Sequence, residues 1–264
     1  MPARPSRTNI ALTIAGSDPS GGAGLQADLK TFHRFGVYGE AVVTLITAQN
    51  TRGVTRVETL RPALVAEQIQ AVLEDLPPNA AKTGALGSRE VLQEVARQAA
   101  RFRFPLVVDP VAVSKHGAVL LDEGAVHSLV EDLLPHAFLL TPNLDEAEVL
   151  TGLKVRDVDA MVRAGEALLS MGARNVLVKG GHLLGSTAVD ILLSHRSPAR
   201  LFRTKRIDTP HTHGSGCTYS AAITALLAQG RALEDAVGEA KKFVTRAIRT
   251  APQLGGGHGP LNHF

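Results

Sequence analysis

The sequence offers almost nothing that could cross-link the chain or bind a soft metal ion. Cys217 is its only cysteine, and tryptophan is absent. A single cysteine excludes an intrachain disulfide framework and a cysteine-rich zinc site. We therefore expect the protein to work in a reducing compartment, for which the cytoplasm is the best fit.

Long apolar runs and a large excess of either charge are missing as well. No stretch reaches the ~18 uninterrupted apolar residues of a membrane-spanning helix, and residues 1–9 contain no apolar segment typical of a signal peptide. The chain has 28 lysines and arginines against 25 aspartates and glutamates, and only 4% aromatic residues. It therefore lacks the basic, aromatic-rich patch that is typical of nucleic-acid binding. Neither a membrane nor a nucleic acid is expected as a partner.

What the chain does contain is a regular alternation of apolar strands and amphipathic helices. Its 264 residues, 44% of them hydrophobic, are enough for one large core, and no linker rich in proline or serine divides them. We predict a single domain over residues 1–264, in which residues 1–9 form a flexible segment. Strands are predicted at residues 10–15, 41–47, 106–108, 137–140 and 175–178. Helices are predicted at residues 25–35, 64–76, 88–101, 124–134, 158–171, 218–229 and 233–250.

This order of elements predicts parallel βαβ units and hence an α/β fold. Two later apolar runs, residues 186–193 and 199–207, are joined by a short polar linker and predict an antiparallel pair at one edge of the sheet. In open sheets of this kind, ligands bind beyond the carboxyl ends of the strands. The residues that follow each strand are therefore the candidates for a functional site.

The strongest local signal is Thr-His-Gly-Ser-Gly-Cys-Thr at residues 212–218, directly before a predicted helix. Small residues there allow successive backbone N–H groups to face one anion, and the helix dipole adds positive potential. Gly214, Ser215 and Gly216 are thus a predicted phosphate site. We expect the same field to lower the pKa of Cys217 below the free value of about 8.5, which makes this thiol a candidate proton acceptor. The alternative is a flexible turn beside a buried core cysteine.

Carboxylates stand at two further positions of interest. Asp109 comes directly after the strand at residues 106–108, and Glu146 lies in Asn-Leu-Asp-Glu, residues 143–146, which opens a helix. Carboxylate oxygens at the carboxyl ends of strands favour a hard cation such as Mg²⁺. For Glu146 the alternative is a helix cap that completes the first turn.

Three more candidates follow predicted strands. Lys179 is suited to contact nucleotide phosphates as a mobile point charge, and its alternative is a solvated lysine. The amide of Gln49 has both a donor and an acceptor, which suits a ring with an amino group beside a ring nitrogen, although turn formation alone would explain residues 50–53. Gly16 begins a glycine-rich loop that fits no nucleotide motif but lets a ligand approach the backbone, and Asp28 lies on the helix that follows.

Two other chemistries are disfavoured by spacing. His211 and His213 are only two positions apart, which gives no pair of ligands on one helix face, so we interpret them as ordinary loop histidines. Gly214, Ser215 and Gly216 do not have the Gly-x-Ser-x-Gly spacing of a hydrolase nucleophile.

Six of these segments occur in order along nearly the whole chain, at residues 11–24, 48–54, 107–111, 141–146, 179–182 and 212–217. Their sequences and spacing closely resemble the hydroxymethylpyrimidine/phosphomethylpyrimidine kinases of thiamine biosynthesis, and residues 257–264 are similar too. The resemblance implies a ribokinase-like fold, in which a mostly parallel central sheet is flanked by helices in three α/β/α layers. It also implies a homodimer.

The reaction implied by the resemblance is ATP-dependent phosphorylation of 4-amino-5-hydroxymethyl-2-methylpyrimidine, and then of its monophosphate to the diphosphate. ATP and Mg²⁺ are the implied cofactors, with Gln49 and Asp28 holding the ring and Cys217 accepting the hydroxyl proton. The implied substrate contacts are Gly16, Ala23, Asp28, Gln49, Ala85 and Val111. The implied contacts to magnesium-ATP are Asp109, Glu146, Lys179, Gly214, Ser215 and Gly216, and the implied catalytic residues are Gly214, Gly216 and Cys217.

The chain departs from the family pattern at two positions. Members of the family often carry methionine where this sequence has Ala85 and Ala112, which leaves the exact substrate open. The first alternative function is therefore a pyridoxal or pyridoxine kinase of the same superfamily. The second is a protein that binds the pyrimidine without catalysis.

Overall fold

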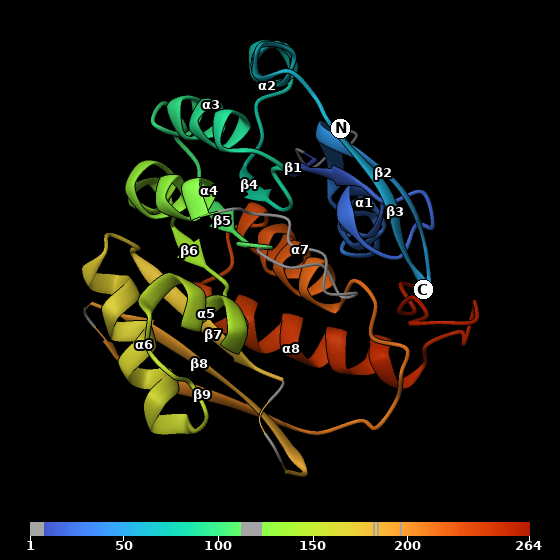
Figure 1. Cartoon of the computed structure of the whole chain (residues 1–264), viewed down its shortest axis with the longest axis vertical. Helices are drawn as coiled ribbons and strands as arrows, with labels where there is room; N and C mark the ends of the chain where they lie inside the picture. Colours follow the sequence, from blue (N-terminus) through green and yellow to red (C-terminus); the bar gives the residue numbers. More distant parts are fainter. Residues whose placement is uncertain (1–7, 112–122, 182, 184, 196) are drawn as a thin grey trace, which may run out of the picture.

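The computed structural model describes residues 8–111, 123–181, 183, 185–195 and 197–264. In this part of the chain, nine strands form one sheet in the order β3-β2-β1-β4-β5-β6-β7-β8-β9 (Figure 1). The strands are β1 Ile10–Ser17, β2 Tyr38–Asn50, β3 Gly53–Thr59, β4 Ala80–Thr83, β5 Leu106–Val108, β6 Leu139–Leu140, β7 Asn175–Gly180, β8 Thr187–Ser194 and β9 Ser197–Lys205. The helices are α1 Gly24–Arg34, α2 Pro62–Asp75, α3 Arg89–Ala99, α4 Glu123–Ser128, α5 Leu144–Thr151, α6 Val158–Ser170, α7 Ser215–Ala228 and α8 Leu233–Arg249.

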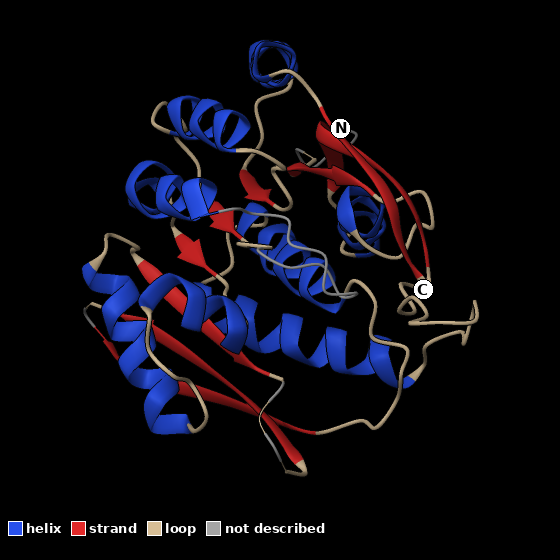
Figure 2. Ribbon diagram, in the orientation of Figure 1, coloured by secondary structure: helices blue, strands red, loops and turns tan. Residues whose placement is uncertain are grey.

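Helices cover both faces of the sheet (Figure 2), because the strands are apolar on both sides. Side chains alternate between the two faces of a strand. In β7, Val176 and Val178 pack into the core that includes residues of α2 to α6, whereas Leu177 packs into the core that includes residues of α1, α7 and α8. This confirms the predicted three-layer α/β/α architecture.

The strand directions agree with the sequence prediction. The strands β2, β1, β4, β5, β6 and β7 run parallel to one another. At the far edge β8 is antiparallel to β7, and β9 is antiparallel to β8, which confirms the predicted edge pair. The carboxyl ends of the parallel strands meet at one edge of the sheet, and the first turn of α7 lies beside them (Figure 1).

Two strands escaped the sequence analysis. The strand β3 is antiparallel to β2 and exposed along most of its length, so its sequence shows no apolar face. The strand β4 is buried between β1 and β5 but has only four residues, and Lys82 interrupts its apolar pattern. The strand β3 is recognisable only from its hairpin pairing with β2, and β4 only from its pairing with the sequence-distant strands β1 and β5.

One predicted helix is divided. The segment predicted as a helix at residues 124–134 consists of α4, a wider turn over Leu129–Leu133 and a tighter turn over Leu134–His136. Pro135 lies in the tighter turn, where its missing N–H group prevents a continuous α-helical ladder. Residues 1–7 of the predicted flexible segment lie outside the described residues, and none of the described helices is long and apolar enough to cross a membrane.

Candidate active site

A cavity of about 1140 Å³ opens at the carboxyl edge of the sheet. Its walls come from the loops after β1, β4, β5, β7 and β9, the end of β2, parts of β8 and α8, and the first turns of α5 and α7. Twelve of the thirteen predicted site residues among those described line this cavity, and Asp28 does not. They are Gly16, Ala23, Gln49, Ala85, Asp109, Val111, Glu146, Lys179, Gly214, Ser215, Gly216 and Cys217.

The first turn of α7 is shaped by a close contact between two backbones. Gly214 caps the helix with a φ of 74°, and a Cβ atom there would lie 1.9 Å from the carbonyl oxygen of Gly22. Only glycine fits this position, because an L side chain disfavours the left-handed conformation and would collide with the loop after β1. The helix begins at Ser215, three residues before the predicted start. Its unsatisfied N-terminal amides therefore belong to the phosphate segment itself.

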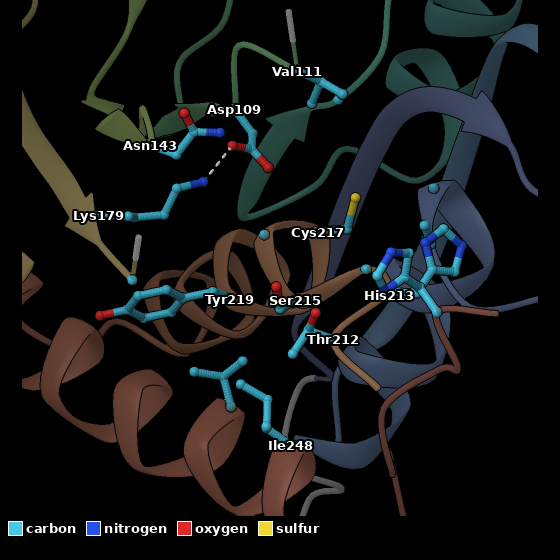
Figure 3. Close-up of a pocket in the computed structure, with 18 of the residues that line it drawn as sticks. Asp109, Val111, Asn143, Lys179, Thr212, His213, Ser215, Cys217, Tyr219 and Ile248 are labelled. Carbon is cyan, nitrogen blue, oxygen red and sulfur yellow. Dashed lines mark hydrogen bonds and ion pairs between the residues drawn. The ribbon is translucent and has the colours of Figure 1, made fainter. Parts of the chain in front are cut away.

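The thiol of Cys217 projects from this turn into the cavity (Figure 3). Burial raises the pKa of Cys217 to about 11, although the nearby Lys82 ammonium group lowers it in part. The carboxylates of Asp28 and Asp109 raise it further, while the backbone N–H of Gly24 acts in the opposite direction. The prediction of a lowered pKa was wrong, because desolvation outweighs the field of the helix.

Across the cavity, Asp109 and Lys179 form an ion pair that joins β5 to β7 (Figure 3). The Lys179 Nζ atom lies 2.9 Å from Asp109 Oδ1, and the hydroxyl groups of Thr141 and Ser220 donate to the same carboxylate. Burial alone would raise the pKa of Asp109, but Lys179 and Lys82 outweigh it and hold the pKa below its usual range. A Cβ atom on Gly216 would lie only 3.5 Å from Lys179 Nζ, so this ammonium group faces the phosphate segment.

Glu146 has the capping role that the sequence offered as an alternative. Asn143 and Glu146 form a capping box: the Asn143 side chain accepts the Glu146 N–H at 2.9 Å, and Glu146 Oε2 accepts the Asn143 N–H at 2.8 Å. Glu146 nevertheless lines the cavity, as Asp109 does. Within the described residues, no group of three or more metal-ligating side chains is present.

Asp28 lies outside the cavity lining, in contrast to the expected contact with the ring. Its side chain is fully buried and forms an ion pair with Lys82 at 2.8 Å, and it also accepts a hydrogen bond from Thr13. Burial raises the pKa of Asp28 more than the Lys82 ammonium group lowers it. The structure assigns Asp28 to a buried pair beside the cavity wall. Lys82 was missed by the sequence analysis, and the only signal was a lysine inside a short apolar strand.

His213 was also misjudged. It is 3% exposed, it lines the cavity next to Gln49, and its Nε2 atom lies 2.9 Å from Asp18 Oδ2. The interpretation as an ordinary loop histidine holds for neither its burial nor its contacts. The ring of His213 packs against Gly22 of the loop after β1, where an added Cβ atom would lie 2.5 Å from it. The only sequence signal for this contact was the position of His213 directly before the phosphate segment.

The predicted ring contacts lie at the end of the cavity nearest β1 and β2. A Cβ atom on Gly16 would collide with Leu45, and the carbonyl oxygen of Ala85 accepts a hydrogen bond from Thr44 at 2.6 Å. Val111 has a φ of 44°, an unusual conformation for a β-branched residue. Ala112, the second alanine in place of a family methionine, lies outside the described residues.

The opposite end of the cavity contains a second polar cluster that the sequence did not reveal. Lys241 of α8 and Asp190 of β8 form an ion pair at 2.6 Å, and both line the cavity with Tyr219. Burial and the neighbouring Asp190 carboxylate raise the pKa of Tyr219 above its usual range. Apolar side chains of α8 and β8 complete this end. They are Ala188, Val244 and Ile248.

Comparison with known proteins places these features in a family. A family model described as phosphomethylpyrimidine kinase matches residues 18–262. The chain is 48% identical over 256 residues to the hydroxymethylpyrimidine/phosphomethylpyrimidine kinase of Synechococcus elongatus, covering 97% of each chain. It is 51% identical over 254 residues to the thiamine biosynthesis bifunctional protein ThiED of Geobacter sulfurreducens, covering 96% of this chain but only 52% of that protein.

The fold has a close counterpart among solved structures. The pyridoxal kinase from Staphylococcus aureus in complex with AMP-PCP superimposes with a TM-score of 0.90 at 35% identity, covering 98% of this chain and 94% of that one. This agrees with the ribokinase-like fold implied by the sequence motifs. Because the family model spans most of the chain and the relatives are about half identical, the chain belongs to the phosphomethylpyrimidine kinase family.

Proposed function

We propose that the protein transfers the terminal phosphoryl group of ATP to the hydroxymethyl group of 4-amino-5-hydroxymethyl-2-methylpyrimidine, and then phosphorylates the monophosphate to the diphosphate. One observation carries the proposal: the phosphate segment and Cys217 lie in a single cavity between Gln49 on one side and the Asp109–Lys179 pair on the other. A ring acceptor and a phosphoryl donor can therefore meet at the first turn of α7. Family membership supports this assignment.

Binding of the ring belongs to the end of the cavity near β1 and β2. The Gln49 amide supplies a donor and an acceptor for the amino group and the adjacent ring nitrogen. Gly16, Ala23, Ala85 and Val111 complete the predicted wall with small or apolar surfaces, which suits the flat, weakly polar faces of a pyrimidine. This placement directs the hydroxymethyl arm towards Cys217.

Phosphates are held by positive charge from the opposite wall. The amides at the start of α7 act together with the helix dipole on the oxygens of the transferred group. Lys179 adds a full charge, and it stays protonated because Asp109 and Glu146 raise its pKa against the effect of burial. Such preorganised donors stabilise the charge that develops during transfer.

Asp109 and Glu146 are proposed to hold Mg²⁺ through water. Mg²⁺ is usually bound by one or two carboxylates together with substrate phosphates and several waters, so two carboxylates in one cavity fit it without a closed protein cage. The lowered pKa of Asp109 keeps that carboxylate charged at neutral pH. When bound, the ion supplies charge that neutralises the phosphate oxygens.

Cys217 is proposed as the acceptor of the hydroxymethyl proton. With a pKa of about 11 the thiol is almost entirely protonated at neutral pH, so its activity as a base depends on the nearby Lys82 ammonium group, which favours the thiolate. In the second reaction the attacking group is a phosphate oxygen, which needs no strong base. The two reactions should therefore depend on Cys217 to different degrees.

Replacing Cys217 tests both the reaction and this role. The wild-type protein, incubated with magnesium-ATP and the hydroxymethyl pyrimidine, should give a diphosphate identified by its mass. Cys217→Ala should slow phosphorylation of the hydroxymethyl compound by about 100-fold or more, as expected for loss of a general base, but that of the monophosphate by less than about tenfold. Equal losses in the two rates would refute the role of Cys217. Absence of ADP release with every pyrimidine would instead favour a binding protein without catalysis.

Pyridoxal phosphorylation is the second candidate. The observation in its favour is the structural similarity to the Staphylococcus aureus pyridoxal kinase, together with Ala85 in place of a larger side chain. Measuring kcat/KM for pyridoxal in the same assay decides between them. The kcat/KM for the pyrimidine should clearly exceed that for pyridoxal, because the Gln49 amide matches the amino group and the adjacent ring nitrogen of the pyrimidine.

The thiol itself provides a test that is independent of catalysis. Because the thiolate is the reactive form and Cys217 is the only cysteine, its alkylation by iodoacetamide reports its pKa directly. The rate should rise about tenfold for each pH unit and level off only near pH 11, whereas free cysteine levels off above about 8.5. A plateau between pH 8 and 9 would show that the helix field dominates over burial after all.

We also propose a cytoplasmic homodimer. Exposed large apolar side chains occur on β2, β3 and α2, at the end of the sheet remote from β9. They are Tyr38, Ile46, Val57 and Leu64. Sedimentation should give twice the mass of one chain, and Ile46→Lys should shift the population towards monomer, because a buried charge without a partner opposes association. A monomeric wild-type protein would contradict the dimer.

A further inference from the structure

Three side chains from separate segments meet at the ring end of the cavity. Asp18 lies in the loop after β1, His213 precedes α7, and Gln49 is near the end of β2. Asp18 Oδ2 and His213 Nε2 are 2.9 Å apart, and the Gln49 amide lies 3.2 Å from the same nitrogen. Asp18 and His213 are each only 3% exposed, so their hydrogen bonds with each other and with the protein fix their positions.

The position of the proton on His213 follows from Asp18. Burial alone would raise the pKa of Asp18, but hydrogen bonds from His213 and Ser20 outweigh it and lower the pKa to about 2. An ionised carboxylate can only accept hydrogen bonds. Because Asp18 Oδ2 also accepts the N–H of Ala23 at 2.8 Å, its position is fixed by the loop. His213 Nε2 must therefore carry a hydrogen and donate it.

A donor at His213 Nε2 requires an acceptor from Gln49. The structure places Nε2 of the amide at the His213 end and Oε1 at the Thr47 end, which sets two donors against each other. The two ends of an amide have the same shape, so its orientation is decided by its hydrogen-bond partners. Rotating the amide by half a turn brings Oε1 to His213, whose single Nε2 hydrogen is then shared between Asp18 Oδ2 at 2.9 Å and Gln49 Oε1 as a three-centre hydrogen bond.

The other end of the amide supports the same rotation. The Thr47 hydroxyl donates its only hydrogen to the carbonyl oxygen of Ser17 at 2.9 Å. Its oxygen, 3.3 Å from the Gln49 amide, is then left as an acceptor. After rotation the Gln49 NH₂ group donates to Thr47, and every contact pairs a donor with an acceptor.

We propose that Asp18, acting through His213, is a specificity-determining positioning residue that holds the Gln49 amide in one orientation. Oε1 is then fixed beside His213 and the NH₂ group beside Thr47. Each end of the amide keeps one group for the substrate: the second lone pair of Oε1 accepts a hydrogen bond, and the second hydrogen of the NH₂ group donates one. The positions of this acceptor and this donor are then fixed. This inference rests on the proposed role of Gln49 as the contact to the ring.

The fixed order selects a particular ring edge. An amino group beside a ring nitrogen presents a donor and then an acceptor, which matches Oε1 and the NH₂ group of Gln49. In the 4-oxo analogue a carbonyl oxygen replaces the amino group and the ring nitrogen carries hydrogen, so the order is reversed. If the Gln49 amide cannot turn, its Oε1 faces the carbonyl oxygen of the analogue and its NH₂ group faces the ring N–H. Neither contact can then form a hydrogen bond.

The test compares the amino substrate with its 4-oxo analogue. For the wild-type protein, kcat/KM should favour the amino compound by at least about 100-fold, because buried polar groups would be left unpaired with the analogue. In Asp18→Asn an NH₂ group at the Oδ2 position gives up the Ala23 contact but can donate to His213, so that the ring can lose its Nε2 hydrogen and the Gln49 amide is free to turn. The preference should fall below about tenfold, while the KM for ATP stays within about twofold.

Three further variants make the outcome decisive. His213→Asn removes the link to Gln49 but leaves the contacts of Asp18 with Ser20 and Ala23, so it should lose the preference even if Asp18→Asn fails to fold. His211→Asn, in the same loop but outside the cavity lining, should retain it. If Gln49→Ala leaves the preference unchanged, the proposed ring contact fails. If Gln49→Ala removes the preference while Asp18→Asn and His213→Asn retain it, the positioning role alone is refuted.

Nitrogen NMR of the histidine rings gives a readout that does not depend on turnover. The signal that disappears in His213→Asn should show a protonated Nε2 in the wild-type protein at neutral pH, and this hydrogen should move or exchange faster in Asp18→Asn. An unprotonated Nε2 in the wild-type protein would overturn the proposal.

Discussion

The close contact between two glycine-rich loops is the constraint on which the rest of the site depends. Besides the approach of Gly214 to Gly22, a Cβ atom on Gly24, whose φ is 56°, would lie 2.3 Å from the carbonyl oxygen of Gly16. Side chains at these positions would separate the loop after β1 from the start of α7. Only with this contact can the Gly24 amide act on Cys217 and Asp18 reach His213. These glycines therefore hold the loop that lines the ring end of the cavity against the phosphate segment at the start of α7.

A second requirement is the balance of buried charge. Three acid–base pairs lie along the side of the sheet that faces α1, α7 and α8: Asp28 with Lys82, Asp109 with Lys179, and Asp190 with Lys241. Removing one partner of such a pair would leave an uncompensated buried charge, at a cost of about 3–5 kcal/mol. The Cys217 thiol remains neutral chiefly because burial raises its pKa, and the Asp28 and Asp109 carboxylates add to this effect against the Lys82 charge.

Much of the fold could be predicted because its strands and helices show a local periodicity of apolar residues. The buried parallel strands β1, β5 and β7 and the long amphipathic helices appear as apolar patterns, and glycine and carboxylates after strands indicate where ligands bind. The strands β3 and β4 could not be found in this way, since one is exposed and the other contains Lys82. The strand β4 depends on pairing with segments far apart in the sequence, whereas β3 is held by its hairpin with β2.

The site was predicted as a set of residues rather than as a set of interactions. The sequence placed Cys217 correctly next to the phosphate segment at the start of α7 but gave the wrong direction for its pKa, because burial depends on neighbours from β4 and α1. For a similar reason, Asp28 lies outside the cavity lining and His213 lies within it, which the sequence did not indicate. Asp28 is covered by Lys82, and His213 is drawn into the cavity wall by Asp18. Long-range contacts of this kind leave no local pattern.

The central claim is that the glycine contact at Gly214 builds the site for phosphoryl transfer, and one comparison tests it most directly. Gly214→Ala should fold, as judged by circular dichroism, yet lose about 100-fold or more in kcat/KM for the pyrimidine, because misplaced donors lose their effect on the transferred group. Gly53→Ala, where an added Cβ atom would meet nothing within 4 Å, should remain within about twofold of the wild-type value. A folded Gly214→Ala protein with nearly wild-type activity would contradict the account.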